Sequence, residues 1–367
     1  MPIDPEQWFK RGVTSVLRSF TRSLLDVDLR HFHPESILVV RQHDQLGDML
    51  CIGPLLRALR ERWPSAQITL IASPVNEVVM RHHPFADVVL LYDKKVFFNS
   101  LKSGREFLAK LRSRRCDLAI VPATVSNSLT SNLLAYLSGA QVRIGASSLN
   151  GIEGPSSFLF NVVSALDWRD DVHRHQTLRN LDVLKPLDLT TSDLSLAIGL
   201  TESELRAGSE LVASLRAKHG TLIGFHSGAG KIENRWPAER FVELANALCA
   251  DGRAAAVITA GPKDDKPVAQ VVHKLMCEHT VVSNQSIRLV AALISQLQLF
   301  VTNDTGVMHV AAATGTPTLS LFGPTDPLQW APIGAKHRYV WTEDGRIDSI
   351  QSERVLEEAR EMLSLAS

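Results

Sequence analysis

The segment ILVVRQHDQLGDMLCIGPLLRALRERWPSAQITLI, residues 37–71, contains one complete copy of the pattern that decides the fold. It begins with the apolar run ILVV (37–40), whose β-branched residues predict a buried strand. A polar loop follows, and then an amphipathic stretch over 49–63 predicts a helix that ends before Pro64. QITLIAS (67–73) predicts the next strand. A buried strand, a helix and a second buried strand form a βαβ unit, whose two strands lie parallel in one sheet.

Apolar runs and amphipathic stretches alternate along the rest of the chain, apart from a less regular stretch over 150–195. In the first half, the pattern predicts strands at 88–92, 117–123 and 142–147, and helices at 75–82 and 101–115. In the second half, it predicts strands at 221–227, 254–260, 281–283, 297–303 and 318–322. Helices are expected around them, at 201–219, 237–250, 267–278, 286–296 and from about Val307. This alternation predicts an α/β protein with two doubly wound halves, each a parallel sheet between layers of helices.

Length and composition agree with two domains, because 367 residues correspond to about two domains of roughly 100–200 residues each. We expect an N-terminal extension at 1–35, domains at 36–190 and 191–345, and a C-terminal helix within 346–367. The 45% hydrophobic and 21% charged residues are ordinary for a globular protein. The 39 Lys and Arg residues balance 39 Asp and Glu residues, which argues against nucleic acid as a partner.

Cysteine usage and hydropathy indicate the compartment. The four Cys residues show no CxxC and no paired spacing, so a disulfide framework is not expected and a reducing cytoplasm fits better. No apolar run approaches the ~18–20 residues that cross a bilayer. The first residues also lack the apolar region of a secretory signal. The sequence therefore predicts a soluble, cytoplasmic protein.

Residues 8–25 form a separate first unit with an amphipathic pattern. Six apolar residues share one helical face, and four positive charges without an acid accompany them, three on the opposite face. The pattern is typical of a helix that lies on an anionic membrane surface, which would place the protein on the inner face of the cytoplasmic membrane. The alternative is a helix that covers the body of the protein, and Gly12 favours it because glycine weakens a helix.

Three loops that follow strands carry the candidate functional residues, because open α/β sheets bind ligands at the carboxyl ends of their strands. In the first loop, RQHDQLGDM (41–49), Asp48 lies at or near the start of a helix. It has two readings. It could cap that helix, since Asp is a preferred N-cap residue, or it could point into a cleft as a general base.

The second loop, HSGAGKIENRWPAE (226–239), has the composition of a phosphate-binding loop. Small residues such as Ser227 and Gly228 leave backbone N–H groups accessible to phosphate oxygens. Lys231 and Arg235 add positive charge close by. The loop is not a Walker A motif, because no GK[ST] follows at the required offset.

The third loop lies within TNDTGVMHVAAATGTP (302–317), where Asp304, Thr305 and Gly306 turn the chain from a strand into a helix. The amides at a helix N-terminus favour an anion, and His309 lies one turn further on, on the same side. The alternative is an ordinary helix cap and a half-buried His. Two loops that favour anions in one domain predict a pyrophosphate ligand.

Asp264 follows the strand at 254–260, where an acidic residue can bind the hydroxyl groups of a ribose, and Asp265 is next to it. The alternative is that both are solvated turn residues. The close pairs of His residues in the chain lack carboxylate or Cys partners at ligand spacing, so we expect no metal site.

Taken together, the three loops resemble the family 9 glycosyltransferases, the bacterial heptosyltransferases. The resemblance rests on LGD (46–48), on HSGAG and NRWP (226–237) and on DTGVMHVAAATGTPTLSLFGPT (304–325), and it covers residues 36–335. It implies a GT-B fold, with two Rossmann-like domains that face a cleft. The C-terminal domain would bind ADP-L-glycero-β-D-manno-heptose, and the N-terminal domain a lipid-linked saccharide acceptor, the inner core of lipopolysaccharide. Heptose would be transferred with inversion, without a cofactor or an essential metal.

The resemblance also implies roles for individual residues. Asp48 matches the proposed base that deprotonates the acceptor hydroxyl, and Asp264 or Asp265 matches the acidic position near the ribose. The residues that match the diphosphate-binding motif are Asp304, Thr305, Gly306 and His309.

One departure from the family concerns Asn234, which stands where the family usually has a Lys that contacts the diphosphate. A leaving diphosphate needs its charge neutralised, and Lys231 or Arg235 could supply the missing cation. This departure keeps two alternatives open: a glycosyltransferase of the same fold with another donor or acceptor, and a non-catalytic relative that binds a sugar nucleotide.

Overall fold

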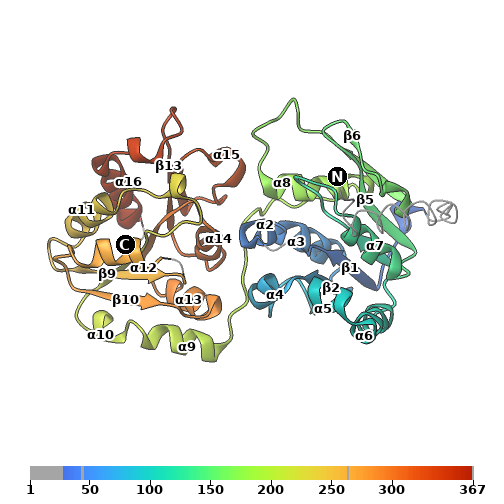
Figure 1. Ribbon diagram of the computed structural model, residues 1–367, viewed down its shortest axis with the longest axis horizontal. Helices are drawn as coiled ribbons and strands as arrows, with labels where there is room; N and C mark the ends of the chain where they lie inside the picture. Colours follow the sequence, from blue (N-terminus) through green and yellow to red (C-terminus); the bar gives the residue numbers. More distant parts are fainter. Residues whose placement is uncertain (1–27, 43–44, 263, 366–367) are drawn as a thin grey trace. The chain divides into compact units, whose positions relative to one another are not determined.

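A computed structural model describes residues 28–42, 45–262 and 264–365. The chain divides into two compact units (Figure 1). Among the described residues, the first consists of 28–42, Ile52–Glu77 and Phe85–Asp193, and the second of Gln45–Cys51, Val78–Pro84, 194–262 and 264–365. Two short segments from the first half of the chain thus belong to the second unit. The amphipathic helix predicted at 8–25 lies outside the described residues.

The first unit is built on a mainly parallel sheet. Its strands are β1 (Ser36–Val40), β2 (Gln67–Ala72), β3 (Val88–Leu91), β4 (Leu118–Ile120), β5 (Val142–Leu149), β6 (Ile152–Glu153) and β7 (Val162–Leu166). The strand order is β3-β2-β1-β4-β5-β6, and β7 also pairs with β5. Only the β5–β6 hairpin is antiparallel. The order reverses between β1 and β4, as in a doubly wound fold.

Helices cover this sheet. They are α3 (Gly53–Arg62), α5 (Lys94–Asn99), α6 (Leu101–Arg112), α7 (Leu129–Leu137) and α8 (Gln176–Leu181). The helix α2 (Leu46–Leu50) belongs to the second unit, and α4 (Pro74–Met80) begins in the first unit and ends in the second. One core joins α6 and α7 to the sheet, with Leu111 and Leu134 packed against buried residues of β1 and β4. Tyr92, Phe97 and Phe107 form an aromatic cluster beside it, with ring centroids 5.2–5.8 Å apart.

The second unit has a sheet in which every pairing is parallel. Its strands are β8 (Thr221–His226), β9 (Ala254–Ala260), β10 (His279–Ser283), β11 (Leu299–Asn303), β12 (Thr318–Leu321) and β13 (His337–Val340). The order β10-β9-β8-β11-β12-β13 is that of the Rossmann fold. The order reverses between β8 and β11, and the carboxyl ends of these strands are where this fold binds ligands.

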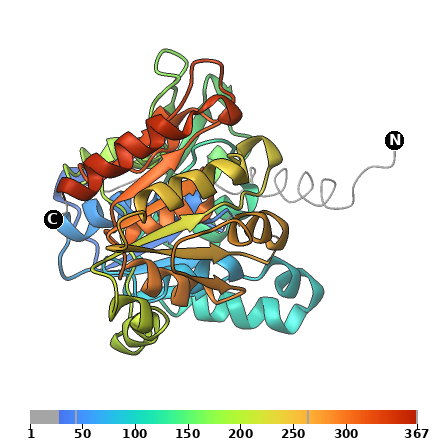
Figure 2. The same ribbon diagram turned by 90° about the vertical axis from the view of Figure 1, so that its left-hand side faces the viewer.

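The helices of the second unit lie on both faces of its sheet (Figures 1 and 2). They are α9 (Glu202–Glu210), α10 (Ala213–Arg216), α11 (Ala238–Leu248), α12 (Asp265–Val272), α13 (Ile287–Ile294), α14 (Gly306–Ala313), α15 (Pro327–Trp330) and α16 (Ser352–Leu365). One core joins α11, α12 and α16 to the sheet, and another joins α10, α13 and α14 to it. Within the described part of the chain, no helix is long and apolar enough to span a membrane.

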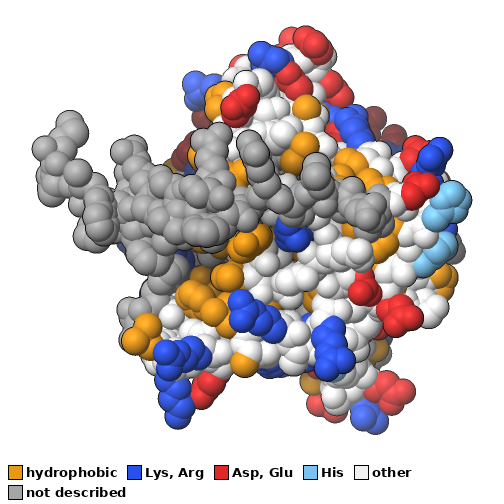
Figure 3. All heavy atoms as spheres, turned by 90° about the vertical axis from the view of Figure 1, so that its right-hand side faces the viewer, with side chains coloured by type: hydrophobic (Ala, Val, Ile, Leu, Met, Phe, Trp, Pro, Cys, Tyr) orange, Lys and Arg blue, Asp and Glu red, His pale blue; other side chains and the backbone are white. Residues whose placement is uncertain are grey.

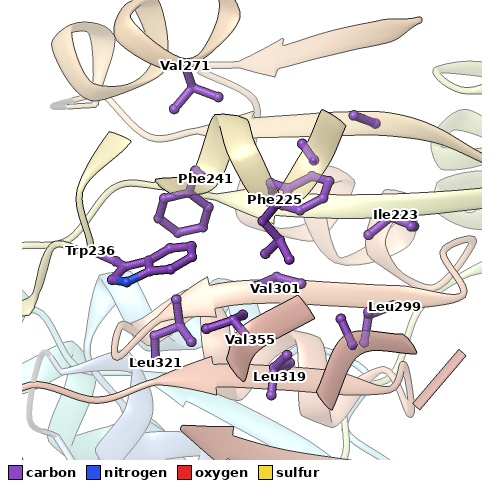
Figure 4. Close-up of a cluster of buried hydrophobic side chains, with 14 of the residues drawn as sticks. Ile223, Phe225, Trp236, Phe241, Val271, Leu299, Val301, Leu319, Leu321 and Val355 are labelled. Carbon is purple, nitrogen blue, oxygen red and sulfur yellow. The ribbon is translucent and has the colours of Figure 1, made fainter. Parts of the chain in front are cut away.

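The larger core of the second unit includes Trp236, which lies at the end of the candidate loop 226–239 (Figure 4). The rings of Trp236 and Phe241 meet edge to face, with centroids 5.0 Å apart. The indole N–H of Trp236 donates a 2.9 Å hydrogen bond to the backbone oxygen of Ile350. Because Trp236 is buried and hydrogen-bonded, it fixes the end of the loop that follows β8.

The parallel α/β architecture predicted for both halves is confirmed. Details differ from the expectations. The helix expected at 49–63 is two helices, α2 and α3, and the one expected at 201–219 is also two, α9 and α10. The strands β7 and β13 and the helix α7 were not predicted.

Candidate functional site

The loop that follows β8, residues 227–237, is tied to the end of β11 by one buried side chain. The side-chain amide of Asn303 donates hydrogen bonds to the backbone oxygens of Ser227 (3.0 Å) and Gly228 (3.2 Å). Its side-chain oxygen accepts a 3.1 Å hydrogen bond from the backbone N–H of Trp236. Asn303 therefore holds both ends of this loop at the point where the strand order reverses.

Asp264 lies against the same loop. Its Oδ2 accepts a 2.9 Å hydrogen bond from the backbone N–H of Gly261, and the residue is buried. A Cβ atom on Gly228 would lie 2.2 Å from Cγ of Asp264, so only glycine leaves room for the carboxyl group there. His226 is the last residue of β8, and its Nε2 lies 3.7 Å from Oδ2 of Asp264.

These loops surround a pocket of about 280 Å³. It is lined by His226, Ala229, Gly230, Arg235, Gly261, Pro262, Asp264 and Thr305. We call it the nucleotide pocket, after the ligand that we propose for it below. It lies at the carboxyl ends of β8, β9 and β11, and its volume is near the lower limit of the roughly 300–1,000 Å³ of typical ligand pockets. It would therefore enclose one part of a larger ligand.

Thr305 is the N-cap residue of α14, yet its side chain makes no capping hydrogen bond. Its hydroxyl oxygen is buried and has no hydrogen-bond partner in the described part of the chain. Thr305 lines the pocket, and because buried polar groups are normally paired, its hydroxyl is a candidate contact for a polar ligand bound there. The first backbone amides of α14 follow Thr305 directly in the sequence, and amides at a helix N-terminus favour an anion.

Asp304 precedes Thr305 and contacts the loop after β8. Its Oδ2 accepts a 3.2 Å hydrogen bond from the side-chain amide of Asn234. Burial raises the pKa of Asp304, while a hydrogen bond from Thr325 and the positive charge of Lys231 act in the opposite direction. A raised pKa makes protonation of Asp304 easier when an anion binds nearby.

The two candidate cations of the loop are placed differently. The guanidinium of Arg235 donates two hydrogen bonds, 2.9 and 2.7 Å long, to the backbone oxygen of Ala229. Two of its N–H groups therefore already have a partner within the loop, although Arg235 also lines the nucleotide pocket. Lys231 is exposed and its charge acts on Asp304.

Asp48 belongs to α2, which packs against α14 within the second unit. Their contact is close, because a Cβ atom on Gly47 would lie 2.7 Å from the ring of His309. The N-cap residue of α2 is Gln45, and Asp48 is the third helical residue, so the reading of Asp48 as the helix cap is wrong. His309 is buried and also meets Trp330, with ring centroids 6.1 Å apart.

Comparison with known proteins identifies the family. The model of glycosyltransferase family 9 (heptosyltransferase) matches residues 105–359. The chain belongs to this family. It is therefore a glycosyltransferase, and it is similar to the lipopolysaccharide heptosyltransferase 2 of Escherichia coli, with 27% identity over 313 residues. That alignment covers 80% of this chain and 85% of the E. coli protein.

Solved structures place this glycosyltransferase in the same fold. A family 9 glycosyltransferase from Veillonella parvula superimposes with a TM-score of 0.81 and 25% identity, over 92% of this chain and 99% of that one. The E. coli ADP-heptose lipopolysaccharide heptosyltransferase II gives 0.70 and 25%, over 90% and 99%. The predicted GT-B fold, with two parallel-sheet α/β domains, is confirmed.

Eight of the ten predicted site residues of this glycosyltransferase lie in the loops at the carboxyl edge of its second sheet or at the start of α14, and the other two, His309 and Asp48, lie further along α14 and in α2. All ten line the nucleotide pocket, belong to the loops around it or lie in α14 and α2: Ser227, Gly228, Lys231, Arg235, Asp264, Asp304, Thr305, Gly306, His309 and Asp48. Sequence reasoning missed Asn303 and His226, although both are polar residues at the carboxyl end of a strand. Within residues 28–42, 45–262 and 264–365, no group of His, Cys, Asp and Glu side chains could hold a metal ion.

Proposed function

We propose that this chain transfers heptose, with inversion, from ADP-heptose to a lipopolysaccharide core or a related surface-glycan acceptor. The observation that carries the proposal is the nucleotide pocket, with the buried carboxyl group of Asp264 and the unpaired hydroxyl of Thr305, in a family 9 glycosyltransferase. The similar E. coli protein is named a lipopolysaccharide heptosyltransferase, which supports this acceptor, and the similar E. coli structure is named an ADP-heptose lipopolysaccharide heptosyltransferase, which supports this donor.

In the proposed donor complex, the diphosphate lies at the N-terminus of α14. The amides of its first turn and the Thr305 hydroxyl would donate hydrogen bonds to phosphate oxygens, and the helix dipole favours the negative charge. Lys231 would neutralise part of the charge that develops on ADP as it leaves. Asp304, with its raised pKa, would be easily protonated beside the diphosphate and could then donate a hydrogen bond.

Asp48 is the proposed general base. Its carboxylate would take the proton from the acceptor hydroxyl as that oxygen attacks the anomeric carbon of heptose. The bond between the anomeric carbon and the diphosphate oxygen breaks, and ADP leaves from the opposite face, which inverts the configuration at that carbon. Gly47, the residue before Asp48 in α2, lacks a side chain that would collide with the ring of His309, so α2 and α14 can pack closely there.

The first unit presents a surface that suits an anionic, lipid-linked acceptor. We define the basic surface as the exposed cationic residues of α5 and α6: Lys94, Lys95, Lys102, Arg105, Lys110 and Arg112. Glu106 is the one acidic residue within these two helices, and Val96 and Leu101 are exposed beside the cations. Figure 3 shows Lys and Arg side chains next to hydrophobic ones on the lower part of this face. Such a mixture supports peripheral binding at the inner face of the cytoplasmic membrane.

The proposal is tested by incubating the purified chain with ADP-heptose and a lipopolysaccharide core that lacks heptose, and measuring the mass of the acceptor. We expect the acceptor to gain one heptose as ADP is released. The Asp48→Asn variant should unfold at a similar temperature, yet transfer about 10²–10⁴-fold more slowly.

Other outcomes would contradict the proposal in distinct ways. Transfer from a UDP-sugar or GDP-sugar, but not from ADP-heptose, would assign another donor to the same fold. Binding of ADP-heptose without transfer to any surface glycan would instead support a non-catalytic relative.

A further inference from the structure

The protonation state of His226 follows from its hydrogen-bond partners. The residue is buried at the end of β8, and its Nδ1 lies 3.1 Å from both the backbone oxygen and the hydroxyl oxygen of Thr259. A backbone oxygen can only accept, and the Thr259 hydroxyl donates its hydrogen to the backbone oxygen of Phe225 (3.4 Å). Nδ1 must therefore carry the ring proton, and it donates to Thr259.

The other ring nitrogen of His226 is then an acceptor. Burial lowers the pKa of His226 and outweighs the opposing effects of the Asp264 charge and of the hydrogen bond with Thr259. An uncharged ring with its proton on Nδ1 leaves a lone pair on Nε2. The nearest carboxylate oxygen, Oδ2 of Asp264, is 3.7 Å away and is also an acceptor. It is held in place by the N–H of Gly261.

Two acceptors therefore face each other across a short gap, and both line the nucleotide pocket. This arrangement is complete only when hydrogen-bond donors enter it, because buried polar groups are normally paired. Two adjacent hydroxyl groups on one sugar ring supply two donors at the spacing that a pair of neighbouring acceptors needs. An anion would be repelled by the Asp264 carboxylate, which excludes phosphate from this part of the pocket.

We infer that Nε2 of His226 and the carboxylate of Asp264 together bind the two ribose hydroxyls of the donor nucleotide, each accepting a hydrogen bond. This inference rests on the proposed function, because it places the ribose of that donor in the nucleotide pocket. β9 is the strand next to β8 in the Rossmann order, and an acidic residue after this strand is suited to a ribose. The part of the inference that is new concerns His226, which becomes a specificity-determining residue.

The consequence is selection for an intact ribose. A nucleotide that lacks one of the two hydroxyls leaves a buried acceptor unpaired, which should weaken binding about 10-fold. If His226 only filled space beside Asp264, its replacement would weaken every nucleotide by the same factor.

The test is a calorimetric titration of ADP, 2′-deoxy-ADP and 3′-deoxy-ADP into the full-length wild type, His226→Phe and His226→Gln. We expect the wild type to bind ADP about 10-fold more tightly than either deoxy analogue. His226→Phe should lose about 10-fold for ADP, but stay within about two-fold of the wild type for the one analogue that lacks the hydroxyl facing His226. His226→Gln keeps an acceptor near the position of Nε2 and should recover part of the loss.

Several results would overturn the inference. Equal weakening of ADP and both analogues by His226→Phe would assign the residue a structural role only. A wild type that binds ADP and its deoxy analogues equally would exclude recognition of the two hydroxyls. If UDP binds more tightly than ADP, but the same dependence on hydroxyls and His226 holds, the proposed donor fails and the inference stands. If no nucleoside diphosphate binds, both fail.

Discussion

The side-chain amide of Asn303, at the carboxyl end of β11, donates a 3.0 Å hydrogen bond to the backbone oxygen of Ser227, at the carboxyl end of β8. These are the two strands between which the order of the second sheet reverses. The loop that supplies much of the nucleotide pocket is thus held by a side chain that does not line the pocket itself. The shape of the site depends on a residue outside it.

Replacement of Asn303 by Ala should lower the free energy of unfolding by about 1–3 kcal/mol, because it leaves the backbone N–H of Trp236 without its partner. Chemical denaturation of the full-length chain measures this change. Gln285→Ala removes an exposed amide and serves as the control. An Asn303→Ala variant as stable as the control would show that this hydrogen-bonded link contributes little.

Gly228 and Gly230 offer a matched pair in one loop. Gly228→Ala should lower the midpoint of thermal unfolding, since its Cβ atom would lie 2.2 Å from Cγ of Asp264. Gly230→Ala should leave the midpoint nearly unchanged, because nothing lies within 4 Å of a Cβ atom there. Equal midpoints for the two variants would contradict the close contact between Asp264 and the loop.

Lys231 is the cation that we expect to replace the Lys of other family members. Lys231→Met should slow heptose transfer about 10–10³-fold, because less charge on the leaving ADP is neutralised. Asn234→Lys places an ammonium group beside Asp304 and should restore much of the rate when combined with Lys231→Met. Asn234→Lys alone, in a chain that keeps Lys231, should change the rate of heptose transfer little. A Lys231→Met variant with the wild-type rate would refute this assignment.

Stability at low pH depends on an ion pair between the buried guanidinium of Arg288 and the partly exposed carboxylate of Glu204. The guanidinium of Arg288 contacts both carboxylate oxygens of Glu204 and also donates to the backbone oxygen of Gly199. This pairing lowers the pKa of Glu204 from 4.5 to about 2. The folded chain therefore releases this proton more readily than the unfolded chain does. The resulting stability is complete above pH 4.5 and is lost as the pH falls toward 2.

The Glu204→Gln variant should consequently be less stable than the wild type by about 1–3 kcal/mol at pH 7. The difference in the free energy of unfolding should shrink as the pH falls below 4.5. Glu202→Gln, in the same turn of α9 and exposed, should show no such dependence. A difference that is constant from pH 7 to pH 3 would contradict the role of the Glu204 charge.

The strands that the sequence predicts well are buried on both faces, such as β1 and β8, because continuous apolar runs mark them. β13 was missed, since HRYV (337–340) is short and polar, as an edge strand can be. The helix expected at 49–63 is interrupted between Leu50, where α2 ends, and Gly53, where α3 begins. The apolar pattern runs on through this break, and Pro54, which suits the first turn of a helix, was its one local signal.

Candidate site residues directly after strands could be predicted, because parallel sheets bring the carboxyl ends of their strands to one edge. Asn303 and His226 could not. Their partners lie in β9 and in the loops that follow β8 and β9, 33 to 76 residues away along the chain, and only the order of the strands brings them together. Lys231 and Arg235 looked equivalent in the sequence, and the hydrogen bonds of Arg235 to Ala229 distinguish them.

The proposed donor site is tested most directly by calorimetric titration of ADP, UDP and GDP into the wild type and the Thr305→Val variant. Val keeps the shape of Thr but removes the unpaired hydroxyl at the start of α14. We predict that ADP binds most tightly to the wild type, and about 10-fold more weakly to Thr305→Val. Tighter binding of UDP or GDP, or the same affinity for ADP in both proteins, would contradict the proposed site.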